Sequence, residues 1–424
     1  MKKYDVAVIG GGPAGAAASI AAARGGAKVL LIEKSNCLGG AACNALVQPF
    51  MEYTTKVNGE KLRLCCGIFE EITTKLEKMQ LEINGWKSKE KPLQFFNEEY
   101  LKVLLDRMVI GAGVELLFHT HLIDAESENG MVKSITISNK SGQEKIFADY
   151  FIDATGDADL AYKAGFSCRL GREKDRLCQP MTLCFRLGNV DTSKLDQAER
   201  KHINTLYQQF QQEGKIKNIR ENVLMFNSTL DNVIHFNSTR IVKLNPTDAF
   251  DLTKAEIEAR EQMMELYLFL KENSPAFKNA FLTSSAPEIG VRESRMIDGE
   301  YLLTTEDLKA CIKFKDSIAL GNYDIDIHNP EGSGTSHYYF SDGEYYSIPY
   351  RSLVPKGAKN LLAAGRCISA THEAQASIRI MPIVYCLGEA AGTACALAKK
   401  EQVPVLKVDT NVLRQILKEN GAAV

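Results

Sequence analysis

The chain has 424 residues, of which 45% are hydrophobic and 25% are charged, so it is long enough to form two domains with separate cores. Lys and Arg number 51 against 53 for Asp and Glu, and the formal net charge of -2 gives no field that would attract nucleic acid or an anionic membrane surface. We therefore expect neither nucleic acid nor a membrane as a partner.

The cysteines and the N-terminus argue against secretion and against a metal centre. The eleven cysteines are scattered and show no CxxC or metal-ligand spacing, which predicts reduced thiols in a cytoplasmic protein without a metal site. The apolar run at the N-terminus stops at glycines before a signal-peptide core can form. No apolar run is expected to approach the roughly 18 residues of a membrane span.

The N-terminal segment predicts a strand, a glycine turn, a helix and a second strand. An apolar run over residues 6–9 precedes Gly10, Gly12 and Gly15, and a second apolar run covers residues 29–32. In such a unit the first glycine allows a tight turn, the second lets a pyrophosphate approach the backbone, and the third lets the helix pack closely on the strand. The phosphates then lie at the helix N-terminus, where free N–H groups and the dipole favour negative charge. The pattern predicts a dinucleotide site.

Two features after the second strand support this site. Glu33 comes eighteen positions after Gly15, where a carboxylate can accept hydrogen bonds from both hydroxyls of an adenosine ribose. The pair Gly39 and Gly40 then gives a loop whose backbone can lie against a ribityl chain or a flavin ring. The alternative, a glycine-rich turn followed by a chance surface glutamate, is disfavoured by the strand–turn–helix–strand context.

The next segments contain no second dinucleotide fingerprint. The sequence Gly-Ala-Gly at residues 111–113 follows a predicted helix and precedes a strand, so we interpret it as the turn that ends the helix. The chain is therefore expected to lack a nicotinamide-binding domain. A later strand over residues 150–153 ends in Ala-Thr-Gly-Asp at residues 154–157.

The middle of the chain has a different pattern of predicted strands and helices, which indicates a cap domain over the cofactor. Residues 181–190 alternate as a strand, residues 191–212 predict a polar helix, and residues 222–242 predict two short strands. A second helix is expected to open at Thr253, with Glu256 completing a capping box.

The segment Gly-Val-Arg-Glu-Ser-Arg at residues 290–295 contains two arginines spaced three apart. We interpret this segment as a strand, where such a spacing places the two side chains on opposite faces. Only one of them can then face a pocket, and Arg292 is favoured over Arg295. His328 and His337 flank a loop rich in turn residues that could border the pocket, although solvated loop histidines are the favoured interpretation.

Near the C-terminus a buried strand leads to Gly365 and Arg366, then to a polar loop with His372 and Arg379, and then to a helix of small residues that is predicted to begin near Pro382. Proline suits the first turn of a helix because its missing N–H has no partner there. A plain connector needs no such charged residues. The loop is therefore expected to face a site above the sheet.

Together these motifs resemble the FAD proteins of the glutathione-reductase-like superfamily, in which a Gly-Gly pair follows the ribose-binding glutamate. The segments at residues 288–304, 346–353 and 360–398 look like those of a bacterial FAD-dependent oxidoreductase family that carries the Gly-Val-Arg-Glu-Ser-Arg sequence. The motifs that carry this resemblance span the whole chain.

The resemblance implies an α/β fold class with two domains. Residues 1–180 and 346–424 would form a discontinuous, Rossmann-like FAD-binding domain of the glutathione-reductase type, and residues 181–345 an α+β substrate or cap domain. FAD is the implied cofactor, and the residues implied to bind it are Gly10, Gly12, Pro13, Ala14, Gly15, Glu33, Lys34, Gly39, Gly40, Ala41, Ala154, Gly156, Asp157, Gly365, Arg366, Arg379, Ile380 and Met381.

In flavoproteins of this superfamily the helix after the polar loop faces the N1–C2=O edge of the isoalloxazine, where its dipole stabilises the negative charge of reduced flavin by ~1 kcal/mol or more. The resemblance then implies catalytic roles for three residues. Arg379 would pair with flavin O2 or a substrate carboxylate, His372 would donate or accept a proton, and Arg292 would face the substrate. The alternatives are a salt bridge to the cap for Arg379 and a structural hydrogen bond for His372.

The disulfide reductases of the superfamily carry two redox cysteines, of which the first corresponds to Cys43 and the second falls at Gln48. Cys43 alone cannot form that disulfide, and it either lines the pocket or is simply packed. Aromatic-ring monooxygenases usually carry Asp where this chain has Arg366.

We therefore predict an FAD-dependent dehydrogenase or reductase that exchanges hydride between flavin N5 and a small molecule. The alternatives are a flavin monooxygenase and a non-catalytic FAD electron-transfer component. Neither the substrate, the electron donor or acceptor, nor the oligomeric state follows from the sequence.

Overall fold

The computed structural model describes residues 3–87 and 93–424, which form a mixed α/β fold. Within these residues the α-helices are α1 (Pro13–Arg24), α2 (Ile68–Asn84), α3 (Glu98–Gly111), α4 (Asp159–Lys163), α5 (Gln197–Gln212), α6 (Ala249–Asn273), α7 (Thr305–Lys309), α8 (His372–Ile378), α9 (Met381–Glu401) and α10 (Thr410–Glu419). Short 3-10 helices cover Gly40–Ala42, Thr192–Lys194, Tyr350–Leu353 and Val405–Lys407.

The strands in the same residues are β1 (Lys3–Ile9), β2 (Val29–Ile32), β3 (Thr54–Val57), β4 (Glu60–Arg63), β5 (Glu115–Leu117), β6 (His121–Glu128), β7 (Met131–Asn139), β8 (Gly142–Asp153), β9 (Cys168–Leu170), β10 (Phe185–Gly188), β11 (Met225–Asn227), β12 (Ile234–Phe236), β13 (Phe281–Ser285), β14 (Arg295–Ile297), β15 (Ser317–Gly321), β16 (Ile325–His328), β17 (Thr335–Tyr338), β18 (Tyr346–Pro349) and β19 (Leu361–Ala363).

The main sheet has the strand order β5-β2-β1-β8-β7-β6, and β19 also pairs with β8. The strands β5, β2, β1, β8 and β19 run parallel, with Val6 opposite both Val29 and Tyr150. The apolar side chains of β1 and β2 are buried on both faces, as parallel strands require when helices cover the sheet. The predicted strand–turn–helix–strand unit is therefore confirmed as β1, α1 and β2 of a Rossmann-like fold.

The strands β6, β7 and β8 form an antiparallel meander at one side of this sheet. Before it, α3 ends at Gly111 and the chain turns through Gly113, whose φ is 85°. That conformation favours glycine, so residues 111–113 form the predicted helix-ending turn.

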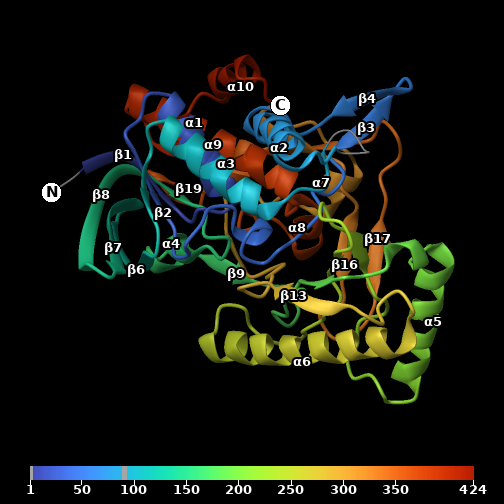
Figure 1. The fold of residues 1–424 in the computed structure, drawn as a ribbon. Coiled ribbons are helices and arrows are strands. Elements are labelled where there is room, and N and C mark those ends of the chain that lie inside the picture. The colour runs from blue at the N-terminus through green and yellow to red at the C-terminus, as the bar shows by residue number, and fades with distance from the viewer. Residues whose placement is uncertain (1–2, 88–92) are drawn as a thin grey trace.

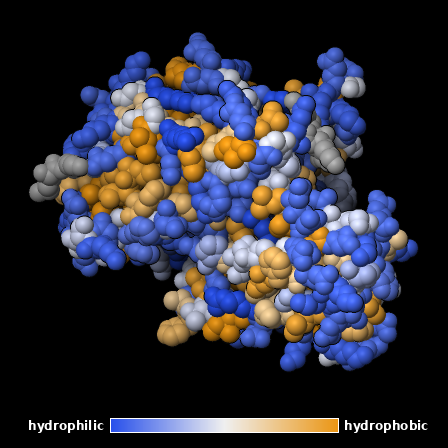
Figure 2. Space-filling view, in the orientation of Figure 1, coloured by the Kyte–Doolittle hydropathy of each residue, from blue (hydrophilic) through white to orange (hydrophobic). Residues whose placement is uncertain are grey.

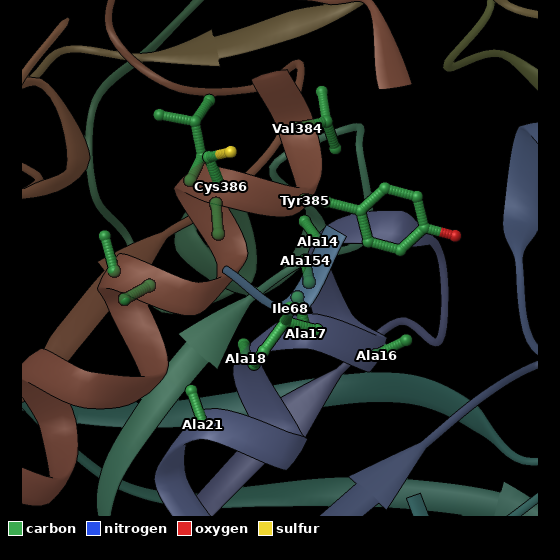
Figure 3. Close-up of a cluster of buried hydrophobic side chains, with 14 of the residues drawn as sticks. Ala14, Ala16, Ala17, Ala18, Ala21, Ile68, Ala154, Val384, Tyr385 and Cys386 are labelled. Carbon is green, nitrogen blue, oxygen red and sulfur yellow. The ribbon is translucent and has the colours of Figure 1, made fainter. Parts of the chain in front are cut away.

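The helix α9 packs directly against α1 through glycines. A Cβ atom on Gly388 would lie 2.1 Å from the carbonyl oxygen of Ala14, and one on Gly392 would lie 2.1 Å from that of Ala18. Figure 3 shows how small the side chains of α1 are at this contact. The alanine-rich and glycine-rich sequences of the two helices therefore allow a closer backbone approach than larger residues would permit.

By length and composition α9 is apolar enough to cross a membrane, with a mean hydropathy of 1.4 in its most apolar window. All residues of that window are buried inside the molecule. The expectation that no segment approaches the length of a membrane span is thus wrong for α9. Its apolar character is accounted for by its position in the core, where it contacts α1, α2 and the sheet.

A second sheet lies apart from the first and has the antiparallel order β11-β12-β10-β13. It packs with α5 and α6, which lie at the bottom of the molecule in Figure 1. The strands β11 and β12 are the two short strands predicted within residues 222–242. Hydrophilic residues dominate the surface of this part on the face drawn in Figure 2.

The helix α6 begins earlier than the sequence predicted. Asp248 is its N-cap, and the carboxylate accepts hydrogen bonds from the backbone N–H groups of Phe250 and Asp251. Thr253 lies inside the helix, where its hydroxyl donates to the carbonyl of Ala249. The predicted capping box at Thr253 is therefore wrong, because Asp248 supplies an N-cap one turn upstream.

The division at residues 181 and 346 stays a prediction. The buried apolar residues around the second sheet come from residues 181–289, together with Leu46. Leu303, Ile318 and Ile325 instead belong to the cluster of buried residues that contains α1 and α9.

The polar segment between β19 and α9 contains α8 rather than a plain loop. Thr371 caps this helix, and its hydroxyl accepts a hydrogen bond from the backbone N–H of Ala374. The next helix, α9, starts at Met381 with Pro382 in its first turn, as predicted. The two helices are thus separated only by Arg379 and Ile380.

Candidate functional site

In the turn between β1 and α1, Gly10 and Gly15 are required by close backbone contacts, whereas Gly12 borders an open space. Gly10 has a φ of 98°, and a Cβ atom there would lie 2.4 Å from the carbonyl oxygen of Ala154. A Cβ atom on Gly15 would lie 1.7 Å from the carbonyl oxygen of Gly10. A Cβ atom on Gly12 would meet only the Cα of Gly40, at 3.9 Å. The open space at Gly12, at the N-terminus of α1, suits a pyrophosphate.

Glu33 follows β2 and turns back toward the same turn. Its Oε2 accepts a hydrogen bond from the backbone N–H of Gly11, and its Oε1 accepts from the N–H and the hydroxyl of Ser35 at 2.8 Å. The side chain is buried and keeps one further lone pair on Oε2, so it can also accept from a ribose hydroxyl. Lys34 instead points to the surface, where its Nζ lies 3.6 Å from Glu288.

The predicted glycine pair meets the first turn. Gly39 has a φ of 103° and Gly40 a φ of 45°, and the 3-10 helix Gly40–Ala42 follows. A Cβ atom on Gly40 would lie 2.8 Å from the Cα of Gly12. The structure therefore brings two backbone turns, which are distant in sequence, into contact around one space.

The end of β8 carries a charged pair beside this space. Asp157 forms a salt bridge of 2.5 Å with Arg366 and accepts a hydrogen bond from Ser294. Burial opposes the charge of Asp157, but Arg366 and Ser294 outweigh it and lower the pKa of this carboxyl. Gly156 lies directly against the guanidinium of Arg366, and Gly365 lies against Ala14 in the first turn of α1.

The helices α1 and α9 aim their N-termini in the same direction. Gly388 faces Ala14 near one end of the contact and Ala396 faces Gly25 at the other, so the two helices run parallel. Met381 precedes Gly388 by seven residues, and at 1.5 Å per residue α9 extends about 10 Å beyond the level of Ala14. Two positive helix ends are thus spaced along one line, which suits an elongated ligand with negative charge at two places.

His372 opens α8 and is paired with a buried carboxylate. Its Nδ1 lies 2.8 Å from Oε1 of Glu293, and the other oxygen of Glu293 accepts from the backbone N–H of Gln179 at 2.8 Å. Glu293 is 0% exposed and His372 is 7% exposed. Within the described residues, no hydrogen bond is formed by Nε2 of His372, which leaves this nitrogen for another partner.

Glu293 was missed by the sequence analysis, although it lies between Arg292 and Ser294 in the segment that was singled out. The signal that was available is the placement of an acidic residue inside an otherwise basic motif. The partner, His372, lies 79 residues away along the chain. Nothing in the local pattern indicates that pairing.

The two arginines of the same segment do separate, but not as residues of one strand. Only Arg295 lies in a strand, β14, where its guanidinium donates to the carbonyl of Asp157 and pairs with Asp159. Arg292 precedes the strand and donates to the carbonyl of Pro180 at 2.7 Å. The predicted strand was therefore too long, because β14 pairs with β9 over only three residues.

Arg379 ends α8, and its terminal nitrogen lies 3.9 Å from Oδ2 of Asp326. Burial, followed by the neighbouring Arg379 and Arg220, lowers the pKa of Arg292. A guanidinium nevertheless remains charged near neutral pH. The structure thus brings the predicted Arg292 and Arg379 together, and the Gln375 side chain, which donates to the carbonyl of Arg292, joins them to α8.

His328 is buried rather than solvated, contrary to the interpretation of its loop. Its Nε2 lies 3.2 Å from Oδ2 of Asp326, and its Nδ1 lies 3.1 Å from the hydroxyl of Thr335. Burial and the nearby Arg292 lower the pKa of His328 to about 3, so the ring is neutral at ordinary pH. His337 is more exposed and pairs with Asp324 at 2.5 Å.

Cys43 is packed rather than pocket-lining. The side chain is 1% exposed, and its thiol lies 3.8 Å from the carbonyl oxygen of Glu98. Burial raises the pKa of this thiol well above its usual value, which disfavours the thiolate needed for redox chemistry. No group of three His, Cys, Asp or Glu side chains that could hold a metal ion occurs within residues 3–87 and 93–424.

A comparison with curated proteins finds a digeranylgeranylglycerophospholipid reductase of Sulfolobus acidocaldarius, which is 28% identical over 184 residues. The match covers 40% of this chain and 37% of that protein's length.

Two solved structures cover nearly the whole chain at low identity. One is a geranylgeranyl bacteriochlorophyll reductase-like protein of Thermoplasma acidophilum, with 14% identity, a TM-score of 0.46, and coverage of 99% of this chain and 84% of that one. The other is the p-nitrophenol 4-monooxygenase PnpA of Pseudomonas putida, with 12% identity, a TM-score of 0.49, and coverage of 100% and 88%.

The profile of one protein family, described as FAD dependent oxidoreductase, matches residues 5–417. The match includes the turns at Gly12 and Gly40, the Glu293–His372 pair and both parallel helices. The chain therefore belongs to the FAD dependent oxidoreductase family, and FAD is its cofactor.

Proposed function

We propose that this protein is a dehydrogenase or reductase that exchanges hydride between FAD and a small molecule. The observation that carries the proposal is the pair formed by His372 and Glu293, because a proton-transfer group lies at the start of α8, next to the helix whose N-terminus would face the flavin. Hydride exchange at a carbon that bears oxygen or nitrogen needs such a group to move the accompanying proton.

The cofactor fits the residues that are present. Gly12 and Gly40 leave space at the N-terminus of α1 for the pyrophosphate, and Glu33 can accept from the ribose. The residues Ile380 and Met381, at the start of α9, would lie near the ring. When bound, FAD supplies the site that accepts or donates hydride.

The proton that accompanies the hydride is moved by side chains of the protein itself. Glu293 accepts a hydrogen bond from Nδ1–H of His372, which fixes the tautomer and leaves the lone pair on Nε2. His372 can then take a proton from the substrate or return one at Nε2, while Glu293 stabilises the imidazolium that forms. The burial of both side chains keeps water away from this proton.

The proposal is tested by anaerobic mixing of the FAD-loaded protein with a panel of small metabolites, followed by flavin absorbance. At least one compound should bleach the flavin. With that compound, His372→Gln should slow reduction by about 10². Glu293→Gln should slow it as well and should change the limb of the pH–rate profile that His372 controls, because the carboxylate no longer orients the ring.

His202→Gln is the matched control, because His202 lies exposed on α5, far from these residues. It should leave reduction unchanged. A product that contains an oxygen atom derived from O2 would replace this proposal with a monooxygenase. If no compound bleaches the flavin while dithionite does, the protein is an electron carrier instead.

A further inference from the structure

Three arginines gather above the polar segment without close carboxylate partners. Arg220 comes from the loop between α5 and β11, Arg292 from the segment before β14, and Arg379 from the end of α8. Glu221, the neighbour of Arg220 in the chain, accepts a hydrogen bond from the hydroxyl of Thr335, which lies 3.1 Å from Nδ1 of His328. Nε2 of His328 lies 3.2 Å from Asp326, the carboxylate that Arg379 approaches. Arg220 and Arg379 also lie close enough to Arg292 to lower its pKa. We call these three residues the arginine cluster.

The hydrogen bonds of the arginine cluster leave most of its donors free. Among the described residues, Arg292 donates only to neutral acceptors, the carbonyl of Pro180 at 2.7 Å and the Asn237 side chain at 3.2 Å. In the part of the chain that the structure describes, neither Arg292 nor Arg220 has a carboxylate oxygen within 4.0 Å. Each guanidinium carries five N–H donors, so most of them are available.

Arg220 is the most informative member because it is only 5% exposed. Its Nε donates to Asn222 over a long 3.4 Å, and within residues 3–87 and 93–424 neither of its terminal nitrogens has a hydrogen-bond acceptor. Arg379 likewise has a buried Nε without a partner. Largely buried guanidinium groups that lack protein acceptors are unfavourable unless water or a bound group satisfies them.

The nearby carboxylates lie closer to other groups than to the cluster, although Oδ1 of Asp326 has no hydrogen-bond partner within the described residues. Asp326 accepts from the hydroxyl of Tyr323 at 3.2 Å and lies 3.2 Å from His328, but it is 3.9 Å from Arg379. Glu221 is paired with Arg240 at 2.8 Å and accepts from the hydroxyl of Thr335. His328 is neutral and therefore adds no charge of its own to the cluster. The cluster keeps an excess of positive charge in a buried place.

A bound oxyanion is the group that satisfies these donors, since the planar fork of arginine matches a carboxylate or a phosphate with two parallel hydrogen bonds. The backbone of Arg292 is joined to α8 through Gln375, and the next residue, Glu293, holds His372. The cluster and the proton-transfer pair are thus anchored to the same segment, residues 292–293, and to the same helix, α8.

We infer that the substrate of this protein carries a carboxylate or phosphate group, which Arg220, Arg292 and Arg379 bind together. This inference rests on the proposed function in one respect, namely that the bound anion is part of the substrate. The cluster orients that substrate with its reacting carbon toward the flavin, while His372 handles the proton.

The test is calorimetric titration of the FAD-loaded protein with succinate and, separately, with inorganic phosphate, at constant ionic strength. At least one of the two should bind saturably to the wild-type protein, and the better ligand identifies the anion. Arg292→Met and Arg220→Met should each weaken that binding by about 10-fold or more, because a hydrogen-bonded charged partner is lost. Asp326→Asn should tighten it severalfold, an effect that a damaged fold cannot imitate.

Arg200→Met is the matched control, because Arg200 also donates to a backbone carbonyl and an asparagine, those of Met225 and Asn227. It lies on α5, outside the cluster, and should leave anion binding unchanged. Absence of saturable binding of both probes, or wild-type affinity in both Arg292→Met and Arg220→Met, overturns the inference. Anion binding that persists in a protein whose flavin no metabolite reduces would instead leave the site standing and refute the proposed hydride transfer.

Discussion

The α1–α9 contact and the arginine cluster differ in how completely their groups satisfy one another. Between α1 and α9 almost nothing remains, since Gly388 and Gly392 let the two backbones touch and these glycines are buried. Between Arg220, Arg292 and Arg379 the protein leaves donors unsatisfied and charges uncompensated. The first region is complete without a ligand, whereas the second is not.

This difference separates stability from recognition. Close packing contributes to folding and tolerates no added volume. Unpaired buried charges oppose folding and are retained where a ligand supplies the missing partner. Substitutions in the first region should therefore change stability, and those in the second should change binding or the properties of the flavin.

The largest effect is expected for Gly388→Ala. Its Cβ would lie 2.1 Å from the carbonyl oxygen of Ala14, and backbone cannot move aside without separating α9 from α1. We expect a loss of about 3 kcal/mol in the free energy of unfolding, measured by urea unfolding with far-ultraviolet circular dichroism. Gly111→Ala, with no atom within 4 Å of the added Cβ, is the control and should be neutral or slightly stabilising. Equal stability of the two variants would show that α9 does not depend on close packing.

Gly12→Val should remove the cofactor and keep the fold. The φ of Gly12 is -66° and its ψ is -174°, which valine can adopt, and the added Cβ would meet only Gly40, at 3.9 Å. The branched side chain would fill the space that the pyrophosphate needs. The purified variant should be colourless after incubation with FAD while its circular dichroism spectrum matches the wild type. A yellow Gly12→Val protein would mean that the pyrophosphate lies elsewhere.

The same contrast explains which parts of the molecule could be predicted from sequence. The βαβ unit, the turn at residues 111–113 and the start of α9 depend on neighbouring residues, so local patterns were sufficient. The helix α8 was missed because charged residues interrupt its short Ala-rich sequence and suggest a loop. The early start of α6 was missed because Asp248 is an equally good N-cap further upstream.

The site depends on partners that are distant in sequence. Arg292 and Arg379 were predicted from their motifs, and their proximity is a result of the tertiary fold. Glu293 and Arg220 were not predicted, because their roles arise only when α8, the second sheet and the loop after α5 come together. A single charged residue in a loop usually indicates a solvated surface, and only burial shows otherwise.

Arg379→Met tests the difference between the two regions, because it removes a charge from the arginine cluster and leaves the α1–α9 contact unchanged. If the guanidinium stabilises reduced flavin, the variant should bind FAD normally, and its two-electron reduction potential should fall by about 30 mV or more, equivalent to about 1.4 kcal/mol. Redox titration against reference dyes measures this. Arg414→Met is the control, since Arg414 also has a buried Nε without a partner but lies on α10. A potential that stays constant, with earlier melting, would make Arg379 a structural link between α8 and Asp326.

A further effect, on the pH dependence of stability, is expected at a carboxylate that interrupts the apolar face of α9. Glu389 is 2% exposed and accepts a hydrogen bond from the backbone N–H of Ile68 at 2.9 Å, and burial raises its pKa to about 7. Between its unfolded pKa of about 4.5 and that value, the folded protein holds more protons than the unfolded chain, so stability decreases as the pH rises.

Glu389→Gln should abolish that decrease, because the amide does not titrate and its oxygen can still accept from Ile68. The variant should gain up to about 2 kcal/mol over the wild type between pH 5 and pH 8, given that one pKa unit corresponds to about 1.4 kcal/mol. Urea unfolding at several pH values measures the slope, and Glu82→Gln, at an exposed position of α2, should not alter it. Parallel curves for Glu389→Gln and the wild type would show that the carboxylate is ionised at no cost in the core. The helix α9 would then tolerate a buried charge as the arginine cluster does. The two regions would differ only in how closely their residues pack.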